Sequence, residues 1–89
     1  MKLTRIDASH PLFEASFTLY EASFPPNERR MREDHLRALQ DADFSPLGAV
    51  EDGMLLADVF LWETEDFCYL EHFAVQPSLR GHGTGSTIL

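Results

Sequence analysis

Residues 73–85 read FAVQPSLRGHGTG, and this stretch decides how the whole sequence is interpreted. An apolar run typical of a strand stops at Val75, and a proline-containing connector leads to Arg80 and three glycines at alternate positions. A strand, a glycine-rich loop and a helix start together form an anion site, because main-chain N–H groups and the positive helix end face one concavity. Arg80 adds a cation with a fork of donors that suits phosphate. The sequence therefore predicts a site for a pyrophosphate-bearing cofactor.

The spacing of the glycines separates the known kinds of phosphate-binding loop. No Gly-x-x-x-x-Gly-Lys run is present, which disfavours the P-loop that binds nucleoside triphosphates. The dinucleotide fingerprint Gly-x-Gly-x-x-Gly is not met either, because Ile88 stands where a pattern that begins at Gly83 needs a glycine. A different nucleotide-binding domain that uses the same loop remains one alternative.

The stretch resembles the acetyl-CoA site of the GNAT superfamily of N-acetyltransferases. The motif of that family, Arg/Gln-x-x-Gly-x-Gly/Ala, is matched by Arg80, Gly83 and Gly85, and the resemblance extends over residues 67–89. In the family this motif follows an apolar strand that ends in Ala-Val and a turn with proline, which correspond here to Ala74, Val75 and Pro77. The resemblance implies an acyl-CoA-dependent N-acyltransferase that passes acetyl from acetyl-CoA directly to an amine, with no covalent enzyme intermediate and no metal.

The resemblance also implies which residues bind acetyl-CoA. The pantetheine arm would lie along the main chain of Phe73, Ala74 and Val75. The pyrophosphate would lie on the loop that follows, which comprises Arg80, Gly81, His82, Gly83, Thr84 and Gly85. In this arrangement backbone N–H groups supply most of the donors, and the Thr84 hydroxyl adds one at the helix start. The cofactor site is thus expected to depend on main-chain geometry more than on side-chain identity.

Direct transfer needs a general base, and residues 67–75 offer two. Glu71 alternates with apolar residues in this strand, and apolar surroundings are expected to raise its pKa. Catalytic bases of the family often lie on this strand; the alternative is that Glu71 faces solvent or pairs with an arginine from the first helices. His72 is the second candidate base and points to the opposite face if the strand is regular. A β-bulge, which the family commonly has here, would change which of the two faces the cleft.

Two helices are expected ahead of the strands. The first begins at Ser9 as N-cap and ends before the Pro25-Pro26 pair, with one aromatic stripe that faces the core. That stripe consists of Phe13, Phe17, Tyr20 and Phe24. The second helix covers residues 31–42, and its stripe consists of Met31, His35, Leu39 and Ala42. We interpret His35 as a packing residue, because no second histidine or cysteine stands at metal-ligand spacing.

The connector between the two helices, residues 24–30, is charged. It resembles the segment that borders the acceptor site in some members of the acetyltransferase family. Glu28 and Arg29 are therefore candidate substrate-binding residues. The equally weighted alternative is a solvated loop that pairs its own charges. The acceptor would be an amine on a small molecule or a peptide.

The remaining residues predict strands at 2–6, 47–51, 54–62 and 67–75, with Asp52-Gly53 as a two-residue hairpin turn. In the strand 54–62 we place Met54, Leu56, Phe60 and Trp62 on one face. Asp58 interrupts that face, which predicts an edge position, a polar pocket or exposure at a twist. The order β-α-α-β-β-β, followed by loop and helix, predicts an α+β fold with a mostly antiparallel sheet. It resembles the N-terminal half of the three-layer acetyltransferase fold.

Residues 1–89 are expected to form a single, partial domain. The family's further elements, a parallel strand, another helix and two more strands, have no counterpart here, so we expect an N-terminal portion, a truncated product or a chain completed by a partner. The strand 67–75 would then leave an open edge, which makes a homodimer through that edge a second alternative. In that alternative the chain is a non-catalytic assembly module, which size-exclusion chromatography would detect as a stable dimer without cofactor.

Composition excludes several functions. The net charge is −8, and between Arg37 and Arg80 there are nine acids and no lysine or arginine, which argues against nucleic-acid binding. This acidic middle would suit a cationic acceptor, although solvated surface acids are the simpler interpretation. No apolar run is long enough to cross a membrane, and no secretion signal is seen. The single cysteine, Cys68, fits a reducing, cytoplasmic compartment and is expected to be a buried, inert thiol.

Overall fold

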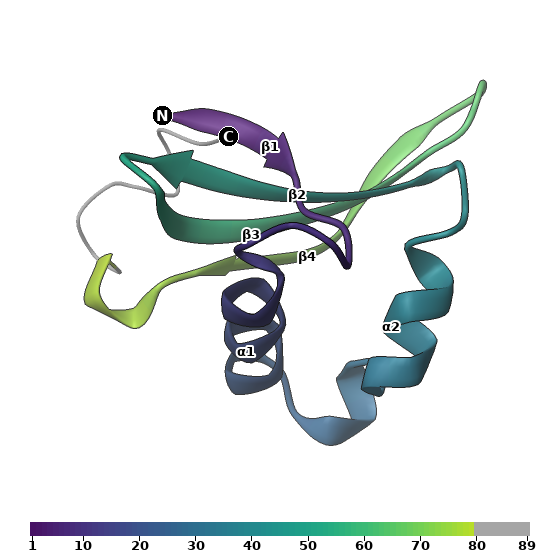
Figure 1. The fold of residues 1–89 in the computed structure, drawn as a ribbon. Coiled ribbons are helices and arrows are strands. Elements are labelled where there is room, and N and C mark those ends of the chain that lie inside the picture. Colours follow the sequence, from purple (N-terminus) through teal and green to yellow (C-terminus); the bar gives the residue numbers. More distant parts are fainter. Residues whose placement is uncertain (80–89) are drawn as a thin grey trace.

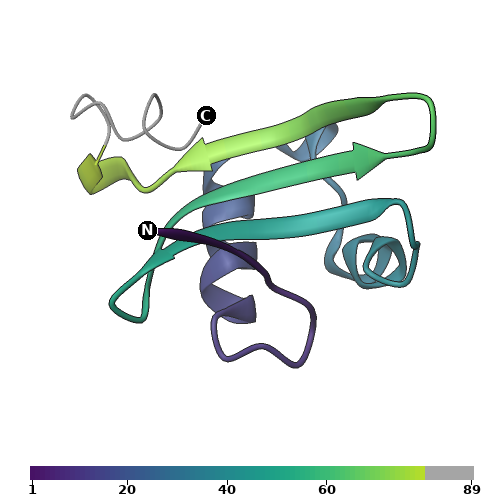
Figure 2. The ribbon, with the colours of Figure 1, turned by 90° about the horizontal axis from the view of Figure 1, so that it is seen from above.

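A computed structural model gives the fold and describes residues 1–79. Four strands form one antiparallel sheet in the order β1-β2-β3-β4. They are β1 (Lys2–Arg5), β2 (Phe44–Glu51), β3 (Met54–Glu63) and β4 (Cys68–Val75). Two helices, α1 (Phe13–Ser23) and α2 (Arg32–Ala38), lie between β1 and β2 in sequence and cover one face of the sheet (Figures 1 and 2). Single 3-10 turns follow α1 at Pro26–Glu28 and β4 at Pro77–Leu79. The predicted α+β class and element order are confirmed over this range.

The predicted aromatic stripe of α1 forms the centre of the core. Phe13, Phe17 and Tyr20 are buried, and Phe24 is half-buried. Tyr20 packs against Phe60 of β3 with ring centroids 5.4 Å apart. Helical spacing places these rings on one face, and burying them removes a large apolar area from water. This packing fixes α1 across the middle of the sheet.

Both helices begin later than expected. α1 starts at Phe13, because the Ser9 hydroxyl donates to Asp7 Oδ1 at 2.9 Å and so stabilises a turn before the helix. It ends at Ser23 as predicted, since Phe24, ahead of Pro25, is extended. α2 is shorter than residues 31–42, because Met31 is extended and short i to i+3 bonds from Gln40 onward close its last turn.

The predicted stripe of α2 is only half right. His35 and Leu39 are buried, whereas Met31 is 76% exposed and Ala42 is exposed too. Both exposed residues lie outside the helix, so helical spacing does not apply to them. The part of the stripe that is helical or directly follows the helix is the part that packs.

The turn Asp52-Gly53 joins β2 to β3 as predicted, with φ of 52° and 77° at its two residues. Next to it, a β-bulge changes which residues of β3 face the helices. Ala49 pairs with Ala57 but Val50 pairs with Leu55, so that Leu56 is an extra residue. The predicted face, Met54 with Leu56, is therefore wrong at this end: Leu55 is buried and Met54 is 65% exposed.

Asp58 lies on β3 between β2 and β4, and it is only 1% exposed. It is therefore neither at an edge nor exposed at a twist; of the predicted settings, the polar pocket is the one observed. Ser16 of α1 donates its hydroxyl to Oδ1 at 2.6 Å, and Oδ2 has no hydrogen bond to any described residue. Burial raises the pKa of Asp58 to about 7, although the bond from Ser16 works in the opposite direction.

Candidate active site

A second β-bulge places both candidate bases on the helix side of the sheet. Phe60 pairs with His72 but Leu61 pairs with Leu70, so that Glu71 is an extra residue in β4. Glu71 contacts Arg30 of the helix connector, and the ring of His72 contacts Tyr20 of α1, with centroids 5.0 Å apart. His72 was expected to face away from Glu71 only if the strand were regular; the alternative, a β-bulge in this strand, is the one observed.

Glu71 forms an ion pair with Arg30. Nη1 of Arg30 donates to Oε1 of Glu71 at 2.5 Å, and the two side chains are 19% and 21% exposed. Burial on its own would raise the pKa of Glu71, but the hydrogen bond and the charge of Arg30 outweigh burial and lower it. The expectation of a raised pKa is therefore wrong. Of the alternatives, pairing with an arginine is observed, but this arginine lies in the connector between the helices and not in a helix. Glu71 is an ionised carboxylate at neutral pH.

Arg30 is held in place from several sides, a role that no local sequence pattern indicates. Its backbone N–H donates to the Tyr20 hydroxyl at 2.6 Å. Its guanidinium lies over the rings of Tyr20 and Phe44, 5.7 and 5.0 Å from their centroids. Its Nη2 is 3.3 Å from Nδ1 of His35. The connector thus fixes a cation directly against the carboxylate of Glu71.

His35 is the buried neighbour of this ion pair. It is 1% exposed and stacks on Tyr20 with centroids 5.6 Å apart. Burial, followed by the charge of Arg30, lowers its pKa to about 4, so the ring is neutral at pH 7. The interpretation of His35 as a packing residue is confirmed. Among residues 1–79 no group of three metal-ligating side chains is present.

His72 bridges Glu71 and the helix connector. Its Nε2 is 3.0 Å from the carbonyl oxygen of Glu28, and its Nδ1 is 3.2 Å from Oε1 of Glu71. Tyr20 and Phe24 contact the imidazole ring edge-on. The main chain of the connector therefore sets the position of this ring.

The two candidate substrate residues, Glu28 and Arg29, differ in their surroundings. The side chain of Glu28 is exposed. The guanidinium of Arg29 donates to the carbonyl oxygens of Glu21 and Phe24, where α1 ends. Arg29 therefore satisfies carbonyl groups that have no partner within the helix. Its charge is already engaged in this contact.

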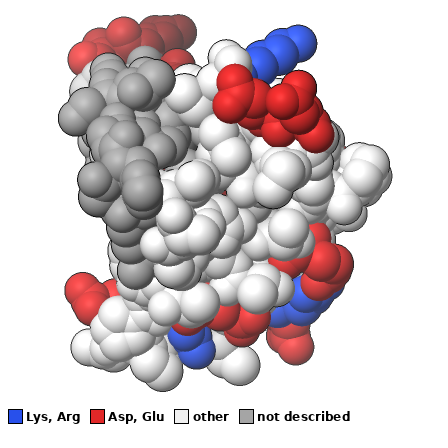
Figure 3. Space-filling view, turned by 90° about the vertical axis from the view of Figure 1, so that its left-hand side faces the viewer, with Lys and Arg blue, Asp and Glu red and all other residues white. Residues whose placement is uncertain are grey.

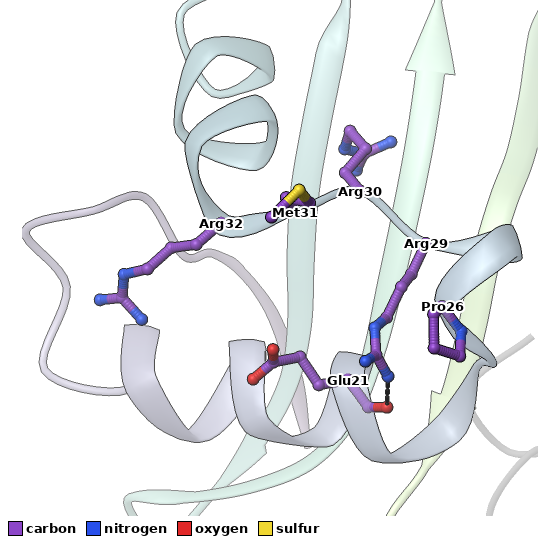
Figure 4. A pocket seen from close by; sticks show the side chains of 6 residues that line it. All are labelled: Glu21, Pro26, Arg29, Arg30, Met31 and Arg32. Carbon is purple, nitrogen blue, oxygen red and sulfur yellow. Dashed lines mark hydrogen bonds between the residues drawn. The ribbon is translucent and has the colours of Figure 1, made fainter.

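A pocket of about 460 Å³ lies between the end of α1 and the connector. It is lined by Glu21, Pro26, Arg29, Arg30, Met31 and Arg32. Figure 4 shows Arg29 reaching down to α1, whereas Arg30 points away from Arg29 toward the strands. Arg30 thus separates the pocket on one side from Glu71 on the other.

Comparison with known proteins shows the family of this chain. The family model for the acetyltransferase (GNAT) family matches residues 9–89. The chain belongs to the GNAT family. It is similar to the solved structure of a GNAT-family protein from Bacteroides thetaiotaomicron, with a TM-score of 0.90 and 27% sequence identity. The match covers 99% of this chain and 51% of that chain, so this chain spans about half the length of its structural relative. A search of the curated proteins found no match.

Only three of the cofactor-binding residues expected from the GNAT motif lie within residues 1–79. Phe73, Ala74 and Val75 are the last residues of β4, where they pair with β3. The 3-10 turn Pro77–Leu79 follows directly. The other predicted residues, Arg80, Gly81, His82, Gly83, Thr84 and Gly85, lie outside the described residues.

The surface of this GNAT chain carries the acidic side chains expected from the sequence, but it also exposes a cysteine that was expected to be buried. In Figure 3 acidic side chains lie around the margin of a largely uncharged face. Cys68, expected to be buried, is an exposed free cysteine because it lies at the start of β4 next to the hairpin turn. No helix in the described part of the chain is long and apolar enough to cross a membrane.

Proposed function

We propose that the protein transfers the acetyl group of acetyl-CoA to an amine, with Glu71 as general base. The observation that carries this proposal is a fixed, ionised carboxylate at the bulge of β4 in a chain of the GNAT family. Acetyl-CoA supplies the activated acetyl group. The amine nitrogen forms a bond to the thioester carbonyl carbon, the carbon–sulfur bond breaks, and the thiolate of CoA leaves. The proton lost by the amine goes to Glu71.

One feature of the described residues and one feature of the sequence beyond them fit acetyl-CoA at the end of β4. Phe73 to Val75 present main-chain groups where the strand leads into the 3-10 turn Pro77–Leu79. In the proposed complex these groups hold the pantetheine arm. The sequence from Arg80 to Gly85 follows within a few residues and would hold the pyrophosphate through N–H groups and the Arg80 guanidinium.

We place the acceptor on the side of the helix connector. The pocket beside it is lined by Glu21, by the apolar side chains of Pro26 and Met31 and by three arginines. Arg29 contacts carbonyl oxygens at the end of α1, Arg30 contacts Glu71 and Arg32 contacts Glu14. The charges of these arginines are therefore engaged, and the acceptor we propose is a partly apolar amine. Arg30 lies between this pocket and Glu71. Glu28 and Arg29 border the same region, and Arg29 acts there by holding the end of α1 in place.

Calorimetric titration of the chain with acetyl-CoA tests this function, with ATP and NAD as competitors. We expect acetyl-CoA to bind and a Gly83→Glu variant to lose binding, because an anionic side chain would occupy the phosphate position. Gln40→Glu, which adds the same charge at an exposed site after α2, serves as the control and should bind normally. Equal displacement by ATP or NAD, or unchanged binding by Gly83→Glu, would contradict the proposal.

A further inference from the structure

We infer that the open edge of the sheet at residues 67–70 is a docking site for an extended segment of a partner protein that carries lysine or arginine. The segment adds to the sheet as another strand, next to the start of β4. This inference goes beyond the function proposed above, because it concerns a surface and a partner that acetyl transfer does not use.

The two edges of the sheet are built differently. β1, at one edge, has four residues, and two of them are Lys2 and Arg5. Short strands and cations protect an edge from pairing with another chain. β4, at the other edge, has eight residues and no lysine or arginine (Figure 2). Among residues 1–79, the stretch 68–70 pairs with β3 alone, so its other side presents main-chain N–H and C=O groups.

The side chains at this edge are apolar and exposed on both faces of the strand. Phe67 and Tyr69 lie on one face, 57% and 48% exposed, and their rings stack with centroids 6.2 Å apart. Leu70, which is 41% exposed, and the free Cys68 alternate with them and lie on the other face. Large apolar side chains exposed next to each other mark an interaction site. An added strand would place its own alternate side chains against these two faces.

The edge is held in shape at both of its ends. At the turn, the Thr64 N–H donates to the carbonyl oxygen of Phe67 at 2.7 Å, and the Thr64 hydroxyl accepts from the N–H groups of Asp66 and Phe67. At the other end, the bulge at Glu71 interrupts the regular spacing of main-chain groups and so limits the site. The stretch between them is a preformed strand edge, which reduces the ordering cost of binding.

Charge decides which kind of segment fits this edge. Glu65 and Asp66 are exposed in the turn beside it, at one tip of the molecule, and Glu63 is exposed at the end of β3 (Figure 1). The carboxylates of these three residues have no ion pair or hydrogen bond with any described residue. By contrast, Glu14 and Asp34 on the helices pair with arginines. A segment that carries lysine or arginine would supply the cations that the hairpin lacks.

The same charges disfavour a second copy of this chain as the occupant. Each copy has a net charge of −8, so two copies repel each other. Residues 38–79 contain no lysine or arginine, and a second β4 therefore brings no cation to the acidic turn. A homodimer through this edge, one of the alternatives considered from the sequence, is thus less favoured than a cationic segment.

The test is an NMR titration of the isotope-labelled 89-residue chain with a capped eight-residue peptide in which lysine and valine alternate. We expect the changes in amide shift to concentrate on residues 67–70. The same peptide with methyl groups on its four central main-chain nitrogens keeps its charge but cannot pair as a strand, so it should bind about tenfold more weakly or not at all. A peptide with glutamate in place of lysine should not bind. Absence of shifts at residues 67–70, or undiminished binding of the methylated peptide, would overturn the inference.

Two double variants separate this site from a general attraction of cations to an acidic protein. Glu65→Gln with Asp66→Asn should weaken binding about fivefold. Glu33→Gln with Glu51→Gln removes the same charge at exposed positions elsewhere and should bind like wild type. Equal weakening in both would contradict a specific site. A dimer in size-exclusion chromatography whose formation shifts residues 67–70 would assign the edge to a second copy instead. These measurements need no acetyl-CoA, so their failure leaves the acetyltransferase proposal intact.

Discussion

At the scale of single residues, Asp58 links pH to the stability of the fold. Its pKa is raised from 3.8 to about 7 in the folded chain, so the unfolded carboxyl group loses its proton first as pH increases. Stability is therefore lost as pH rises from about 4 to about 7 and is constant above this range. The loss is about 4 kcal/mol at most, since one unit corresponds to about 1.4 kcal/mol.

Asp58→Asn should remove this dependence. The amide keeps the shape of the side chain and a bond to Ser16 but has no charge, so we expect a higher free energy of unfolding than in wild type at about pH 8, with the difference narrowing toward about pH 4. Urea denaturation at both pH values measures it. Asp66→Asn, at an exposed turn, is the matched control. Parallel curves for Asp58→Asn and wild type would show that Asp58 is not responsible.

The proposed role of Glu71 as general base can be tested by the isosteric substitution Glu71→Gln. If Glu71 is the general base, Glu71→Gln lowers kcat/KM for amine acetylation by about 100-fold or more, while acetyl-CoA binds as before. Thiol release from acetyl-CoA measures the rate. Glu63→Gln, at an exposed position of β3, should act like wild type. Full activity in Glu71→Gln would assign the base to another group.

At the scale of elements, the turn between β2 and β3 depends on glycine at one position. Gly53 has a φ of 77° with no atom near its missing Cβ, so the cost of a side chain there is conformational only. We expect Gly53→Ala to lower the free energy of unfolding by about 1 kcal/mol and Gly53→Asn by less, because asparagine tolerates positive φ. Thermal denaturation of both variants distinguishes them. Equal losses would mean that crowding, and not φ, sets the cost.

The end of α1 depends on a cation supplied by the connector. Arg29→Met removes the donors to the carbonyl oxygens of Glu21 and Phe24, and we expect a loss of about 1 kcal/mol in the free energy of unfolding. Arg37→Met removes a cation that is exposed on α2 and should have little effect. A loss in Arg37→Met equal to that in Arg29→Met would indicate a general effect of charge.

The elements that the sequence predicted well are those with a simple local pattern, either a helical spacing or a turn dipeptide. Aromatic spacing predicted α1, and the Asp52-Gly53 pair predicted the hairpin. The bulge in β3 was not predictable, because its extra residue, Leu56, does not differ from an ordinary strand residue. The bulge in β4 was expected only through the family resemblance, since Glu71 itself gives no local sign of it. The pair of Arg30 and Glu71 joins positions 41 residues apart, so no local pattern contains it. Local periods thus predicted the elements, and contacts between distant elements determined the site.

At the scale of the whole molecule, the net charge of −8 opposes the approach of an anionic cofactor. We therefore expect the association rate constant of acetyl-CoA to rise as salt increases from about 10 mM to about 150 mM, where charges are screened beyond about 8 Å. Stopped-flow fluorescence measures it. A variant with Glu51→Gln, Glu63→Gln and Glu65→Gln, all exposed, should show a weaker rise. A rate that falls with salt would mean that local cations dominate the encounter.

The extra residue in β4 also bears on how such a protein changes over generations. Loss of the single codon for Glu71 would restore a regular strand, while α1, the connector and β3 would keep their sequences. A one-codon insertion or deletion therefore adds or removes a whole functional group on the helix side, whereas a point mutation only changes the chemistry of a group already there. Alignments that shift a gap by one position in this strand would assign the carboxylate and the imidazole to each other's places. When related sequences are compared in this strand, single-residue insertions and deletions should therefore be counted as well as substitutions.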